Sequence, residues 1–258
     1  MVVTKPALPA ICAAMPDEAA LISAVAKPLG EPTKVGGATF QRIDIANTPA
    51  LLVTSGIGLT NAAAAATIAV TQFGADLLIS AGSAGGMGTD VKVGDIVIGT
   101  ETKYTFADAT AFGKYELGQV PQMPPSYLAD PQLITAVAQR SQPAPRSQAT
   151  PSPHADSGSS ASIPASPGNL TTHQGLIISS DAFITANNFN SVADNFPTAL
   201  AADMETAAIA QVAYLFGVPW LAVRGISDLC GPAAADDFVT HLDDAAALSA
   251  QAIVAMFS

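Results

Sequence analysis

The 258-residue sequence predicts an α/β fold with three layers (α/β/α), in which helices cover both faces of a central, mixed and mostly parallel sheet. Short, continuously apolar runs alternate with helical stretches, as in sheets that are buried on both faces. Apolar residues make up 49% of the chain and charged residues only 12%, so a chain of this length can bury a large core. Because no repeat of solenoid length interrupts the pattern, we expect one domain over residues 1–258.

The predicted elements follow in order along the chain. Apolar runs rich in β-branched residues predict strands at 10–15, 38–45, 50–55, 76–82, 95–104, 175–180 and 219–228. Helical spacing predicts helices at 16–28, 58–73, 130–140, from 203 onward, and 236–257. Pro16 suits a first helical position, and Asp130 and Asp203 suit helix N-caps.

Residues 141–172 break this pattern, because Ser, Pro, Ala, Gly and polar residues dominate the segment. It has too little apolar surface to offset the entropy lost on ordering. We therefore expect a flexible Ser/Pro-rich insertion, and favour a surface loop over a lid or tether.

Composition excludes several classes of function. With 21 acidic and 10 basic residues, the net charge of −11 excludes binding to a nucleic-acid backbone. The apolar runs are too short to span a membrane, and no signal-peptide pattern opens the chain, so we expect a cytoplasmic protein. Cys12 and Cys230 lie in strand-like contexts and are expected to be buried free thiols. The three histidines have no metal-ligand spacing, so we expect neither metal nor cofactor.

Two glycine-rich motifs follow predicted strands. In "TSGIGLTNAAA", Gly56 and Gly58 imitate a dinucleotide-binding turn, but Asn61 replaces the third glycine and makes this a weak match. In "SAGSAGGMG", Ser83 lies among glycines at the carboxyl end of a strand, where open α/β sheets bind ligands. The same glycines also fit a simple tight turn.

Three carboxylates follow predicted strands and are expected at one rim of the sheet: Glu18, Glu205 and Asp228. Acidic residues favour helix N-termini, which gives Glu18 and Glu205 a purely structural alternative. Asp228 ends a nearly uncharged strand, and its position favours a chemical role. Together the three predict a site.

Several motifs, in order along the chain, resemble the 5′-methylthioadenosine/S-adenosylhomocysteine nucleosidases of the nucleoside phosphorylase superfamily. They are "AAMPDEAALI", "TSGIGLTNAAAAATIAV", "DLLISAGSAGGMGTDVKVGDIVI", "ADATAFGKYELGQVPQMP", "GLIISSDAFI" and "ADMETAAIAQVAYLFGVPWLAVRGISD". The resemblance implies a nucleoside phosphorylase-like fold and hydrolysis of an N-glycosidic bond, with adenine released from a 5′-thio-substituted ribose.

The resemblance also implies residue roles. Asp228 would protonate adenine at N7, Glu18 would deprotonate water, and Glu205 would accept hydrogen bonds from the ribose hydroxyls. Ala109 and Phe112 match positions that enter the 5′-pocket of a neighbouring subunit, which implies a homodimer. The remaining matching residues would bind the substrate or hold these groups in register: Ile57, Ser83, Phe183, Ile184, Met204, Arg224 and Ser227.

The sequence departs from the family pattern near three of these residues. Before Glu18, which is itself intact, Met-Pro-Asp-Glu stands where Met-Glu-x-Glu is common. "DMET" stands where Glu-Met-Glu-Ala is usual, and small residues follow Asp228 where an aromatic often covers the ligand. Two other functions stay open: a purine nucleoside phosphorylase, which would need more cationic residues to bind phosphate, and a non-catalytic nucleoside-binding or storage protein. The intact set of Glu18, Glu205 and Asp228 favours the hydrolase. The sequence does not rank methylthio, homocysteinyl, deoxy or futalosine-type 5′-groups.

Overall fold

The computed structural model describes residues 8–140 and 171–258. The predicted insertion at 141–172 lies outside the described residues, apart from its last two. Thr172 begins a strand, so the sheet resumes earlier than the sequence pattern predicted.

All the strands of the described residues join one sheet. They are β1 (Pro9–Ala13), β2 (Lys27–Pro28), β3 (Thr33–Val35), β4 (Ala38–Ile45), β5 (Thr48–Thr54), β6 (Leu77–Gly86), β7 (Ile96–Tyr104), β8 (Tyr127–Leu128), β9 (Thr172–Ser179), β10 (Ala199–Asp203) and β11 (Trp220–Asp228). The helices are α1 (Pro16–Ser23), α2 (Leu59–Phe73), the 3₁₀ helix η1 (Thr110–Phe112), α3 (Pro131–Arg140), α4 (Phe189–Asn195), α5 (Thr206–Phe216) and α6 (Ala234–Phe257).

The sheet has the order β10-β9-β7-β11-β6-β1-β5-β4-β2, with β3 on β4 and β8 on β7. Its middle strands β5, β1, β6 and β11 run parallel, and β7 is antiparallel to β11. Strand β9 is parallel to β7, and β10 is parallel to β9. Strand β10 also pairs with β6, where Ala202 lies opposite Gly85. The strands β6, β11, β7, β9 and β10 therefore form a closed ring.

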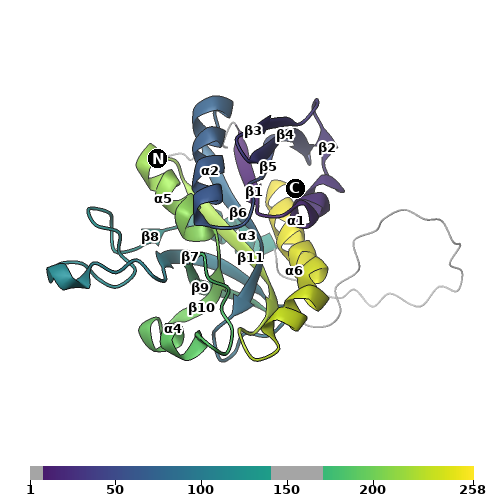
Figure 1. The fold of residues 1–258 in the computed structure, drawn as a ribbon. Helices are drawn as coiled ribbons and strands as arrows, with labels where there is room; N and C mark the ends of the chain where they lie inside the picture. The colour runs from purple at the N-terminus through teal and green to yellow at the C-terminus, as the bar shows by residue number, and fades with distance from the viewer. Residues whose placement is uncertain (1–7, 141–170) are drawn as a thin grey trace, which may run out of the picture.

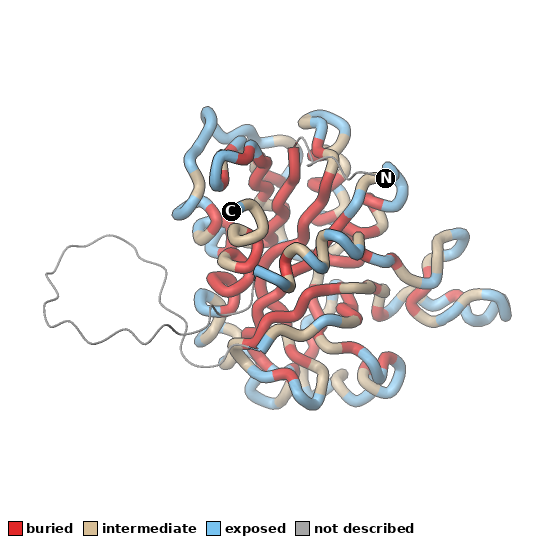
Figure 2. Tube along the Cα trace, turned by 180° about the vertical axis from the view of Figure 1, so that it is seen from behind, coloured by how far each residue is buried: buried red, intermediate tan, exposed pale blue. Residues whose placement is uncertain are grey.

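Helices cover both faces of the sheet, as the sequence predicted (Figure 1). Helices α2 and α5 pack together on one face, and α1, α3 and α6 pack together on the other. Along β1, Ala10 and Cys12 join the core beneath α2 and α5, whereas Ile11 and Ala13 join the core beneath α1 and α6. Figure 2 shows the buried segments gathered in the middle of the molecule and the exposed ones around them.

The main departure from the predicted elements is the length of β6. Residues 83–86 were expected in a loop after the strand, but β6 continues to Gly86. Only Gly82 of this glycine-rich segment has a positive φ, +136°. The absence of side chains at Gly85 and Gly86 instead lets the end of β6 contact β10 and β11 closely, because a Cβ at Gly85 would collide with Cys230.

Other boundaries also differ from prediction. Helix α1 ends at Ser23, and Lys27–Pro28, expected in that helix, forms β2 against β4. Strand β10 was not predicted, and α5 begins at Thr206 instead of directly after Asp203. Short or edge elements carry little periodic signal, which explains why β3, β8 and α4 were also missed. Asp130 caps α3 as predicted, because its Oδ1 accepts a hydrogen bond from Gln132 N at 2.8 Å.

Candidate active site

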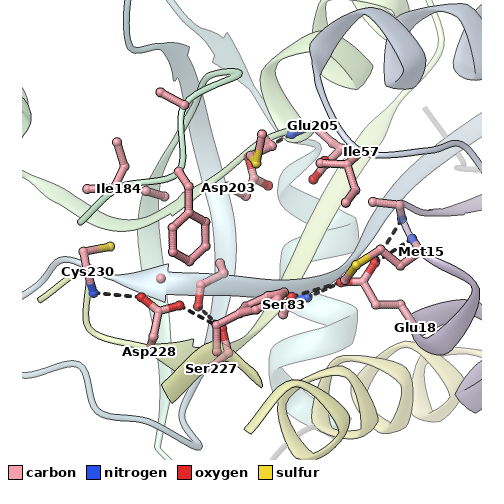
Figure 3. Close-up of a pocket in the computed structure, with 18 residues that line it drawn as sticks. Met15, Glu18, Ile57, Ser83, Ile184, Asp203, Glu205, Ser227, Asp228 and Cys230 are labelled. Carbon is pink, nitrogen blue, oxygen red and sulfur yellow. Dashed lines mark hydrogen bonds between the residues drawn. The ribbon is translucent and has the colours of Figure 1, made fainter. Parts of the chain in front are cut away.

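A pocket lies where β6, β10 and β11 end and where the chain leaves β1, β5 and β9 (Figure 3). In Figure 3, Glu18, Asp228 and Glu205 lie on three sides of the pocket. The predicted site residues that line it are Glu18, Ile57, Ser83, Phe183, Ile184, Met204, Glu205, Ser227 and Asp228.

The Glu18 carboxylate is held by four donors. Glu18 lies in the first turn of α1, and its side chain turns back toward the end of β1. Its Oε2 accepts hydrogen bonds from Ala14 N at 3.0 Å and Met15 N at 3.1 Å. Its Oε1 accepts bonds from Ser83 N at 2.9 Å and Ser83 Oγ at 3.0 Å. Gly82 leaves room for this carboxylate, because a Cβ there would collide with Oε1. These four hydrogen bonds fix the position of the carboxylate as an acceptor.

Asp228 has a different environment at the end of β11. Its Oδ1 accepts a hydrogen bond from Cys230 N at 2.8 Å, and its Oδ2 accepts one from Ser227 Oγ at 3.0 Å. Burial raises the pKa of Asp228, and these two hydrogen bonds oppose that rise. A carboxyl group with a raised pKa retains its proton closer to neutral pH, so Asp228 is suited to donate one.

Glu205 is the N-cap residue of α5. Its Oε1 accepts a hydrogen bond from Gly58 N at 2.9 Å, and its Oε2 lies 3.4 Å from Arg224 Nη2. Burial raises the pKa of Glu205 to about 7, and the positive charge of Arg224 limits the rise. Glu205 therefore changes charge near neutral pH, where its capacity to accept hydrogen bonds changes with it.

Arg224 does not line the pocket but lies buried beneath it, 1% exposed. Its Nη2 forms an ion pair with Asp203 Oδ2 at 2.8 Å. Asp203, predicted only as a helix cap, accepts hydrogen bonds from Glu205 N at 3.3 Å and Thr206 N at 3.2 Å, although it ends β10. Asp203 thus links the backbone at the start of α5 to the buried cation.

An aromatic pair borders the pocket. The Phe183 and Phe238 rings are in an edge-to-face arrangement, with centroids 5.6 Å apart. Phe238, on α6, was missed by the sequence analysis, which expected only small residues after Asp228. It lies ten residues beyond Asp228, and the close packing of α6 on β11, where Gly225 faces Ala245, brings it back to the site. An aromatic wall suits a flat ligand.

The backbone N–H groups at the start of α2 already donate hydrogen bonds to the protein's own carboxylates. Gly58 N donates to Glu205, and Leu59 N donates to Asp181 Oδ1 at 2.7 Å. A phosphate group would need these same N–H groups in a dinucleotide-binding turn. These contacts argue against a dinucleotide at this turn, for which the sequence motif was already a weak match.

The charged residues among those that line the pocket are all acidic: Glu18, Asp203, Glu205 and Asp228. The pocket thus presents hydrogen-bond acceptors and apolar walls, and its lining contains no Lys, Arg or His within the described chain.

In the parts of the chain that the structure describes, no helix could cross a membrane.

The two remaining predicted residues lie outside the pocket. Ala109 and Phe112 belong to the segment between β7 and β8, which projects from the body of the molecule (Figure 1). Ala109 is buried, whereas the Phe112 side chain is 73% exposed.

The residues of the pocket lining that sequence reasoning missed are mostly small or next to predicted ones: Ala14, Met15, Ala84, Gly85, Ala182, Ala202, Asp203, Cys230 and Phe238.

Comparison with known proteins gives consistent matches over nearly the whole chain. A family model described as the phosphorylase superfamily matches residues 10–258. A 5′-methylthioadenosine/S-adenosylhomocysteine nucleosidase from Staphylococcus aureus (strain MRSA252) is 38% identical over 209 residues, which is 81% of each chain.

Two solved structures of such nucleosidases are also similar. The Neisseria meningitidis protein, in complex with methylthio-immucillin-A, has a TM-score of 0.83 and 32% identity, covering 96% of this chain and 97% of its own. The Colwellia psychrerythraea 34H protein, in complex with adenine, has a TM-score of 0.83 and 31% identity, covering 98% of this chain and 95% of its own.

Proposed function

The chain belongs to the 5′-methylthioadenosine/S-adenosylhomocysteine nucleosidases of the phosphorylase superfamily, and we propose that Asp228, Glu18 and Glu205 carry its reaction. It is an N-glycosyl hydrolase that releases adenine from these nucleosides and leaves a 5-thio-substituted ribose. The observation that carries the proposal is the unequal environment of the three carboxyl groups around one pocket.

Asp228 is the general acid. Breaking the bond between C1′ and adenine leaves the electron pair on the base, so the base departs more easily when it gains a proton. Burial raises the pKa of Asp228 and keeps that proton available. Ser227 Oγ and Cys230 N fix the orientation of the carboxyl group through their hydrogen bonds.

Glu18 is the base that orients water. Bond cleavage creates positive charge on the ribose, as in other glycoside hydrolyses. Water adds its hydroxyl to C1′ and gives its other proton to Glu18, while Asp228 gives its own proton to the departing adenine, so the proton gained at Glu18 balances the one lost at Asp228. Ser83 and the backbone at 14–15 hold the carboxylate in place during this transfer.

Glu205 binds the ribose hydroxyls as an ionised acceptor, with Met204 beside it in the pocket lining. Phe183 stacks on adenine, and Ile184 reads the purine edge through its main chain. Ile57 borders the same pocket beside the start of α2. These assignments rest on the position of each residue in the lining together with the family membership.

Water, and not phosphate, is the acceptor in this proposal. A phosphorylase needs cationic donors around its phosphate. Arg224 is buried and bound to Asp203 and Glu205, and the charged residues of the pocket lining in the described chain are acidic.

We expect adenine release from methylthioadenosine at the same rate with and without inorganic phosphate, because no residue of the described pocket lining is placed to bind it. Chromatography of the products checks both adenine and the ribose product. Strict dependence on phosphate, with a ribose phosphate as product, would overturn the hydrolysis proposal. Absence of adenine release from any adenosine thioether would favour a nucleoside-binding protein instead.

Asp228→Asn should lower kcat for adenine release by about a hundredfold or more, because the amide cannot donate the proton. The variant should unfold at the wild-type temperature, since Asn retains the shape of Asp. Asp243→Asn, at an exposed position of α6, is the matched control and should retain wild-type turnover. Wild-type turnover in Asp228→Asn would remove Asp228 from the role of acid.

The kcat/KM for methylthioadenosine should rise as the pH increases through about 7, the value to which burial raises the pKa of Glu205. Below that pH the carboxyl group is neutral and accepts hydrogen bonds from ribose poorly; above it the group is ionised. Steady-state kinetics between pH 5 and 9 measure this. The rising part of the profile of kcat/KM against pH is its acid limb. If Glu205→Gln keeps the same acid limb, a group other than Glu205 produces it.

We further propose that the protein works in the cytoplasm as a homodimer. The described cysteines Cys12 and Cys230 are both buried free thiols, as expected in a reducing compartment. Large apolar side chains are exposed on α5, on β8 and on the segment between β7 and β8: Tyr214, Leu215, Leu128, Phe106 and Phe112. Exposed apolar side chains on neighbouring elements favour a protein interface, and the family match makes a second copy the expected partner.

Phe112→Ala should raise KM for methylthioadenosine about tenfold with little change in kcat, because Phe112 would line the partner's 5′-pocket. Leu29→Ala, an exposed apolar residue at a distant edge, is the control and should leave KM unchanged. Sedimentation velocity gives the oligomeric state. A wild-type monomer at micromolar concentration, or an unchanged KM in Phe112→Ala, would contradict this arrangement.

A further inference from the structure

Beneath the pocket, Arg224 Nη2 has more acceptors than hydrogens. A guanidinium Nη atom carries two N–H groups. Within 3.4 Å of Arg224 Nη2 lie Ser80 Oγ at 2.6 Å, Asp203 Oδ2 at 2.8 Å, Thr206 Oγ1 at 3.2 Å and Glu205 Oε2 at 3.4 Å. The Glu205 contact is the longest of the four. The support that Glu205 receives from Arg224 therefore depends on how strongly the other acceptors bind the same nitrogen.

The Thr206 hydroxyl affects how strongly Asp203 binds the Arg224 nitrogen. Its hydroxyl donates a short hydrogen bond to Asp203 Oδ2, the same oxygen that pairs with Arg224. Because the hydroxyl has one hydrogen, the 2.9 Å bond between Ser80 and Thr206 must have Ser80 as the donor. Ser80 Oγ then accepts from Arg224. Thr206 thus supplies part of the hydrogen bonding that Asp203 would otherwise take from Arg224.

We propose that Asp203 and Thr206 form a positioning pair that divides the Arg224 charge between two carboxylates, and so sets how much of that charge supports Glu205 at the ribose. Neither side chain needs to touch the reacting atoms. The inference rests on the proposed function for the role of Glu205, and it adds two residues to which that function gives no part. It also accounts for "DMET" as a unit, since the Asp and the Thr of this motif bond to each other.

The remaining contacts of Asp203 keep it fixed. Its Oδ1 accepts a hydrogen bond from Ser179 Oγ at 2.5 Å, and that hydroxyl in turn accepts one from Ala207 N at 2.9 Å. Asp203 is 8% exposed and Thr206 is fully buried. Buried carboxylates and cations keep their charge only when paired and hydrogen-bonded, so small changes here alter the charge of Glu205.

Each neighbour of Glu205 acts on its charge with a definite sign. Arg224 on β11 favours the ionised form, and so does Gly58 N at the start of α2. Asp203 at the end of β10 and Glu18 on α1 disfavour it, as does burial itself. Removing the Asp203 charge and removing the Thr206 hydroxyl should therefore affect Glu205 in opposite directions.

The experiment compares Thr206→Val with Asp203→Asn in the full-length protein. Val has the shape of Thr but no hydroxyl, so Asp203 should bind Arg224 more strongly. The acid limb of kcat/KM for methylthioadenosine should then move to higher pH by about 0.5 to 1 unit, with a higher KM at pH 7 and little change in kcat. Asp203→Asn removes a like charge beside Glu205 and should move the limb to lower pH by a similar amount.

Two controls isolate the hydroxyl group. Thr206→Ser retains the hydroxyl group and should keep the acid limb of kcat/KM at the wild-type pH. Thr71→Val, the same change at an exposed position of α2, should leave the limb unchanged. If Thr206→Val does not fold, Thr206→Ala removes the same hydroxyl with less steric change and carries the same expectation. Thermal unfolding of each variant verifies that it is folded at the assay temperature.

Carbon-13 NMR titration of the glutamate carboxyl groups in the ligand-free protein gives a second measurement that needs no activity. The Glu205 signal is the one lost in Glu205→Gln. Its midpoint should rise in Thr206→Val and fall in Asp203→Asn. Midpoints that stay at the wild-type value, or move in the same direction, would overturn the positioning pair. A wild-type protein that releases no adenine would instead overturn the proposed function, while the titration still tests the pair.

Discussion

The site depends on the burial of one cation beneath a pocket lined with carboxylates. Arg224 is 1% exposed, and a guanidinium in that position is tolerated only with compensating charge and hydrogen bonds. Asp203 and Glu205 supply the charge directly, and Glu18 lies near enough to influence Arg224. These groups come from β10, the start of α5, β11 and α1, so a single electrostatic requirement fixes the relative placement of segments that are far apart in the sequence.

The closed ring of strands brings these segments together. Because β10 pairs with the end of β6, Asp203 and Glu205 face the strand that carries Ser83. The glycines at the end of β6 allow β10 and β11 each to approach β6 closely there, and Cys230 and Asp228 occupy the space next to Gly85. This closure brings Asp228, Glu18 and Glu205, the proposed acid, base and ribose-binding group, around one pocket. Residues on an open, flat sheet would lie farther apart.

The sequence predicted the α/β architecture and the rim of carboxylates because both depend on local pattern. Continuous apolar runs mark strands buried on two faces, and Glu18, Glu205 and Asp228 each follow such a run or begin the next helix. It did not predict β10, whose five residues precede α5 without a turn signal, nor the strand character of residues 83–86. Asp203 was predicted as the N-cap of α5, but the N-cap is Glu205; Asp203 ends β10, and its pairing with Arg224 and Thr206 depends on the fold. Phe238 was missed because α6 must first pack on β11 before that side chain reaches the pocket.

The position of β11 in the sheet determines when the molecule can acquire this site. Strand β6 has β1 as one neighbour, which precedes it in the chain, but its other neighbour along its full length is β11, which begins more than 130 residues later. During synthesis one edge of this largely buried strand therefore stays unpaired until most of the polypeptide has left the ribosome. Long-range pairing of this kind slows folding, and an open apolar edge can bind other chains. The topology that gathers the acidic groups thus also makes the nascent protein dependent on protection of that edge.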